Sequence, residues 1–88
     1  MLTENNWMIY GEGHALAYKR VEADIQKINM LITGSEEGYS LAIEAGMDSV
    51  SVALKSKSME EACMDADEFA KAYFLDKARL FEEIADRI

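Results

Sequence analysis

The chain has 88 residues, of which 50% are apolar, so it can form one domain with a core of modest size. Seventeen acids against nine bases give a net charge of −8, which argues against a surface that neutralises phosphates of nucleic acid or of an anionic membrane. The single cysteine, Cys63, excludes an intramolecular disulfide and a thiolate zinc cluster. We therefore expect one domain, residues 1–88, with no direct contact with nucleic acid or membrane.

The sequence has no run of 18 apolar residues, and its first residues lack the basic and apolar regions of a signal peptide. These observations predict a cytoplasmic protein. Residues 1–13 contain a short apolar run, Trp7 to Tyr10, followed by two glycines that break a helix. We expect an arm or a short strand there.

Residues 14–32 show a helical pattern. Apolar side chains recur at spacings of 3, 4, 3 and 4, which places them on one stripe of a helix: Tyr18, Val21, Ile25, Ile28 and Ile32. Thr33 and Gly34 would then end the helix. The sequence therefore predicts a helix over residues 14–32.

Residues 39–55 change to a period of two. Tyr39, Leu41 and Ile43 alternate with smaller or polar residues, and a second alternating run follows Gly46. This pattern predicts a β-hairpin with one face on the core and one in water. The alternative is a single poor helix interrupted at Gly46.

A long helix is predicted over residues 59–87. Ser58 and Glu61 form a capping box, and no glycine or proline occurs from Met59 onward. The predicted fold is therefore α+β, with a helix, a β-hairpin and a long C-terminal helix in two layers. The alternative is an all-α helical hairpin or bundle.

Two surfaces of the long helix are candidates for binding other proteins. Its acids form a ridge that could engage a basic groove on a partner: Glu60, Glu61, Asp65, Asp67 and Glu68. Its second half should extend past the hairpin and carry apolar residues that meet a second copy or another protein: Phe74, Ala78, Phe81, Ala85 and Ile88. A homodimer is the expected assembly.

No catalytic motif is present, and the one histidine and one cysteine have no partners at the spacing of a metal site. We expect no enzymatic activity, no metal and no cofactor. The main hypothesis is a small acidic binding protein, such as a phage- or mobile-element-type inhibitor that mimics nucleic acid and covers a basic surface. The alternatives are an oligomeric structural or assembly protein, and a protein that binds a nucleotide between subunits through Tyr10, His14, Lys19 and Arg20.

Overall fold

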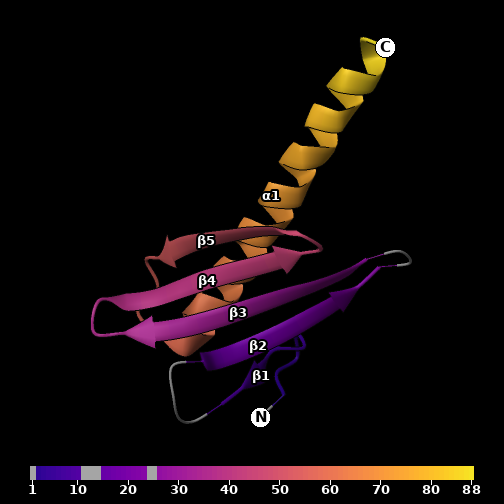
Figure 1. Cartoon of the computed structure of the whole chain (residues 1–88). Coiled ribbons are helices and arrows are strands. Elements are labelled where there is room, and N and C mark those ends of the chain that lie inside the picture. Colours follow the sequence, from indigo (N-terminus) through magenta and orange to yellow (C-terminus); the bar gives the residue numbers. More distant parts are fainter. Residues whose placement is uncertain (1, 11–14, 24–25) are drawn as a thin grey trace.

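The computed structural model describes residues 2–10, 15–23 and 26–88. It contains five strands and one helix in two layers, with the helix lying across one face of the sheet (Figure 1). The elements are β1 (Met8–Ile9), β2 (Ala15–Glu22), β3 (Lys27–Ser35), β4 (Gly38–Ala45), β5 (Asp48–Leu54) and α1 (Met59–Asp86). The predicted α+β class is confirmed, and the all-α alternative is wrong.

The sheet is an antiparallel meander in which each strand pairs with its neighbours in the chain, in the order β1-β2-β3-β4-β5. Cα partners along the central pair include Met30 with Ile43 and Ile32 with Leu41. The β4–β5 connection is a two-residue loop whose first residue, Gly46, has a φ of 65°. A glycine with positive φ at that position is typical of the tight turns that join hairpin strands.

The predicted helix over residues 14–32 is wrong, because this segment forms β2 and most of β3. Successive residues of a strand point to opposite faces, so Tyr18 lies on the outer face of the sheet and Val21 on the helix side. The predicted helical stripe had placed both residues on one face. The expected stop at Thr33 and Gly34 lies inside β3. Ile25, the middle residue of the stripe, lies outside the described residues.

The physical reason is that pairing with β4 stabilises β3 as a strand. Ile28, Met30 and Ile32 also alternate with period two, and β-branched residues suit a strand that packs against neighbours on a pleated surface. On the outer face, the Tyr18 hydroxyl donates a hydrogen bond of 2.6 Å to Asn29 Oδ1 across the β2–β3 pair. The spacings of 3 and 4 were compatible with a helix, but the sheet contacts decided the outcome.

The other two elements agree with the sequence-based expectation. The hairpin predicted over 39–55 is β4 and β5, and the long helix predicted over 59–87 is α1. Ser58 is the N-cap, and its hydroxyl accepts a hydrogen bond of 3.2 Å from the backbone N–H of Glu61. Within residues 1–13, β1 is a short strand, and residues 11–13 lie outside the described part of the chain.

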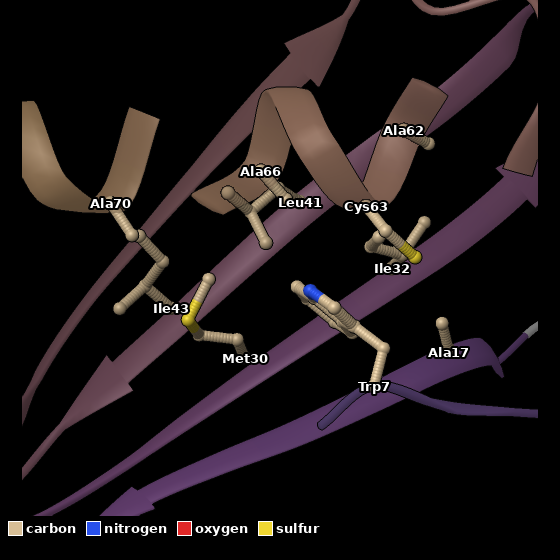
Figure 2. Packing of buried hydrophobic residues seen from close by; sticks show 10 residues of the cluster. All are labelled: Trp7, Ala17, Met30, Ile32, Leu41, Ile43, Ala62, Cys63, Ala66 and Ala70. Carbon is tan, nitrogen blue, oxygen red and sulfur yellow. The ribbon is translucent and has the colours of Figure 1, made fainter. Parts of the chain in front are cut away.

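The core lies between the sheet and the first half of α1 (Figure 2). The helix contributes small side chains, and the sheet contributes larger ones together with Trp7 from the N-terminal arm. The buried set is Trp7, Ala17, Met30, Ile32, Leu41, Ile43, Ala62, Cys63, Ala66 and Ala70. Because alanine is small, the helix axis can lie close to the sheet, and any added volume on this helix face must displace a strand residue.

This packing predicts that enlarging a core-facing alanine destabilises the fold. We expect Ala66→Leu to lower the free energy of unfolding by about 1–3 kcal/mol, because Ala66 has no free space toward the sheet. The matched control is Ala72→Leu, an exposed position on the same helix, which should change it by less than about 0.5 kcal/mol. Urea unfolding followed by circular dichroism measures both, and equal effects would contradict the packing.

Candidate interaction surface

Helix α1 extends beyond the sheet that it covers. Its 28 residues span about 42 Å at 1.5 Å per residue. Its last buried residue is Ala70, its last half-buried residue is Lys77, and residues 78–88 are exposed throughout. We call residues 78–88 the overhang, which is the free end of the helix in Figure 1.

The overhang carries an apolar face that continues the core-facing side of the helix. The four large apolar residues on it are exposed to 53% (Leu80), 62% (Phe81), 48% (Ile84) and 101% (Ile88). Each stands 18 residues after one of the four buried helix residues, Ala62, Cys63, Ala66 and Ala70. Eighteen residues are five turns at 3.6 residues per turn, so Leu80, Phe81 and Ile84 point in the same direction as their buried counterparts, and Ile88 follows the C-cap residue Arg87. We call Leu80, Phe81, Ile84 and Ile88 the overhang face.

The sheet ends at the base of the overhang. Lys77 Nζ lies 3.7 Å from Asp48 Oδ2 at the start of β5 and 4.8 Å from the centre of the Tyr73 ring. The pKa of Lys77 is raised, first by its hydrogen bond with the Tyr73 side chain and further by the charge of Asp48. Met47, in the turn beside Asp48, is fully exposed. An apolar residue therefore stands at the end of the sheet next to the overhang.

The two halves of α1 differ in net charge. Residues 59–70 contain five acids and no base, whereas residues 71–88 contain four acids and four bases. The second half is therefore electrically balanced within a chain of net charge −8. This is the part of the helix where a second copy of the chain meets the least repulsion.

The predicted acidic ridge is not a uniform solvent face. Glu60, Glu61 and Glu68 are exposed. Asp65 is half-buried and accepts a hydrogen bond of 2.6 Å from the hydroxyl of the buried Ser56. Asp67 is also half-buried, so two of the five carboxylates already have partners inside the fold.

Asp67 joins the helix to the N-terminal arm and to β2. Its Oδ1 atom accepts a hydrogen bond of 3.1 Å from Trp7 Nε1 and one of 2.9 Å from Lys19 Nζ. The Lys19 and Asp67 side chains are only 15% and 17% exposed, and the ammonium lies 5.6 Å from the centre of the Trp7 ring. Thr3 holds the arm by accepting from the Trp7 backbone N–H at 3.0 Å. Because Lys19 and Asp67 are largely shielded from water, loss of the Asp67 carboxylate would leave the Lys19 ammonium and the Trp7 indole N–H without compensation.

Three of the four residues predicted to bind a nucleotide between subunits are described, and Tyr10, Lys19 and Arg20 do not lie together within one chain. Lys19 points to the helix side of the sheet and Arg20 to the outer face, since they are adjacent in one strand. His14 lies outside the described residues, and Tyr10 is exposed on the arm. A groove of about 480 Å³ between the arm and α1 is lined by Lys19, but Tyr10 and Arg20 do not line it. The described members of the predicted set therefore do not form one cluster within a single chain, and a site between subunits stays a prediction from the sequence.

Cys63 is buried in the core and has the properties of a structural thiol. Burial raises its pKa, the charge of Asp67 raises it further, and Lys19 acts in the opposite direction. The thiolate is the reactive form of cysteine, so a raised pKa lowers reactivity near neutral pH. This agrees with a packing role for the side chain.

Within the described ranges, no group of three or more His, Cys, Asp or Glu side chains could hold a metal ion. No helix of these ranges has the length and apolar character needed to cross a membrane. No protein-family model, curated protein or solved structure matches this chain.

Sequence reasoning missed part of this surface. The apolar surface predicted from the sequence leaves out Leu80 and Ile84, which belong to the overhang face with Phe81 and Ile88. The 18-residue repeat of the apolar positions in α1 was a signal that could have identified them. Met47 gave no such signal, because its position beside the helix depends on how the hairpin packs.

We expect Asp67→Ala to lower the free energy of unfolding by about 2–3 kcal/mol, because it leaves the Trp7 indole and the Lys19 ammonium without their acceptor. The control is Glu68→Ala, which removes an exposed carboxylate one residue later and should cost less than about 0.5 kcal/mol. Urea unfolding followed by Trp7 fluorescence measures both variants. A cost for Asp67→Ala no greater than that of the control would contradict the anchoring role.

The surroundings of Cys63 predict slow alkylation. At pH 8 we expect iodoacetamide to modify the folded protein at least about tenfold more slowly than the urea-unfolded protein, because burial and the raised pKa both reduce accessible thiolate. The rate for the folded protein should rise with pH as the thiol ionises. Mass spectrometry of quenched samples gives the rates, and equal rates in the folded and unfolded protein would contradict the assignment.

Proposed function

We propose that this chain is a non-catalytic assembly protein that pairs through its overhang with a second copy of itself. The observation that carries the proposal is the overhang face, where the core-facing stripe of α1 continues beyond Ala70, the last buried residue of the helix. Contiguous apolar surface of this kind is typical of protein interfaces.

The character of the residues supports a helical partner. The face of α1 that packs on the sheet carries alanines and a cysteine, which allow close approach to strands. The overhang carries leucine, phenylalanine and isoleucine at the equivalent positions. Large side chains of this kind fill the space between two helix axes, which lie about 8–10 Å apart.

The charge distribution supports a second copy as the occupant. Two chains of net charge −8 repel each other over most of their surface. The balanced second half of α1 is the region where both signs are present and can be matched across a twofold axis. A homodimer, predicted from the sequence, is the smallest such assembly.

The inhibitor hypothesis receives less support from the geometry. It relies on a ridge of five carboxylates, of which Asp65 and Asp67 accept hydrogen bonds within the fold. Glu60, Glu61 and Glu68 are the exposed carboxylates that such a protein would present to a basic partner. A cytoplasmic location and a basic protein partner remain predictions from the sequence.

Light scattering during size-exclusion chromatography tests the proposal. We expect the chain to be a dimer at tens of micromolar and the double variant Phe81→Ala/Ile84→Ala to be a monomer at the same concentration. Each truncation removes apolar surface worth about 1–2 kcal/mol when buried.

The matched control is Leu75→Ala/Met64→Ala. Both residues are exposed, at 60% and 55%, but they point away from the core-facing side of α1. This control should remain dimeric, and circular dichroism should show the same helix content in all three proteins. A monomeric parent chain at tens of micromolar would refute the proposal.

A further inference from the structure

The spacing of residues along the second half of α1 defines how two copies can meet. Phe74, Lys77, Phe81, Ile84 and Ile88 follow one another at spacings of 3, 4, 3 and 4. This spacing is the seam of a two-helix coiled coil, with one polar residue among the apolar ones. The inference below rests on the proposed pairing of two copies and concerns its direction and register.

The sheet decides the direction. The side of α1 that carries the seam is occupied by the chain's own sheet as far as Phe74, which packs against the core. In a parallel, in-register pair, the first half of the second helix would lie along this same side, where the sheet already lies. In an antiparallel pair, the first half of the second helix continues past Ile88 and away from the sheet. We infer that two copies pair antiparallel through residues 77–88.

The seam also sets the register. The seam has two alternating sets of positions, one with Phe81 and Ile88 and the other with Lys77 and Ile84. In an antiparallel pair a residue of one set faces a residue of the other set, so Phe81 of one copy packs against Ile84 of the other, and the twofold axis repeats this contact. Lys77 then faces Ile88 of the second copy. A shift of one heptad toward greater overlap would bring Ile88 to Ala70, which is buried under the sheet.

Residues beside the seam agree with this register. Ala78 faces Ala85 of the second copy, and two small side chains let the helices approach closely. The end of the second helix reaches the base of the overhang, where Met47 lies fully exposed beside the Asp48–Lys77 contact. Met47 thus supplies an apolar contact for the Ile88 end of the second copy.

Site-directed crosslinking tests the direction and register. Ala78→Cys and Ala85→Cys are made separately on a Cys63→Ala background, and one of the two carries an affinity tag so that mixed and like pairs differ in mass. A short bifunctional maleimide is added to each protein alone and to their mixture after subunit exchange. We expect the mixed pair to crosslink at least tenfold more than either like pair.

The oligomeric state of each protein is measured alongside by light scattering. Dimers in which the mixed pair crosslinks no better than the like pairs would overturn the antiparallel register while leaving the proposed function standing. Monomers of the parent chain would overturn the proposed function and this inference together. A further variant, Met47→Ser, should weaken the dimer about threefold or more, whereas Met64→Ser should leave its dissociation constant unchanged.

Discussion

The close contact between α1 and the sheet is the constraint on which the rest of the structure depends. Ala62, Ala66 and Ala70 are small enough to bring the helix down onto Leu41 and Ile43, which are 0% and 1% exposed (Figure 2). The helix is continuous from Met59 to Asp86, so its direction is fixed once this first half is seated. The position of the overhang is therefore a consequence of packing about 22 Å away, at roughly 1.5 Å per residue from Ala66 to Phe81.

The polar contacts of Asp67 complement this apolar contact. Trp7 closes the open end of the core from the arm, and its indole N–H needs an acceptor once the ring is buried. Asp67 supplies the acceptor, and Lys19 compensates its charge. One carboxylate thus links three segments that are distant in sequence, which explains why a residue of the predicted acidic ridge serves the fold instead of a partner.

Some elements of the fold could be predicted from the sequence and others could not, because only some of them depend on local signals. The capping box at Ser58, the absence of helix breakers after it and the alternation in 39–55 are local signals, and they gave α1 and the β4–β5 hairpin correctly. The segment from Ala15 to Ser35 carries apolar residues that fit both a helix and strands, and contacts with β4 selected the strands. The Trp7–Asp67 hydrogen bond joins residues 60 positions apart, so no local pattern could reveal it.

The meander order of the sheet has a consequence for how the chain folds. Every strand pairs with its neighbour in the sequence, so each hairpin can form as soon as its second strand is available, with short loops to close. The apolar face of that sheet stays open to water until α1 is complete enough to cover it. A chain in which α1 has not docked exposes Ile32 and Leu41 on a paired sheet, and such exposed apolar surface is what makes partly folded chains aggregate.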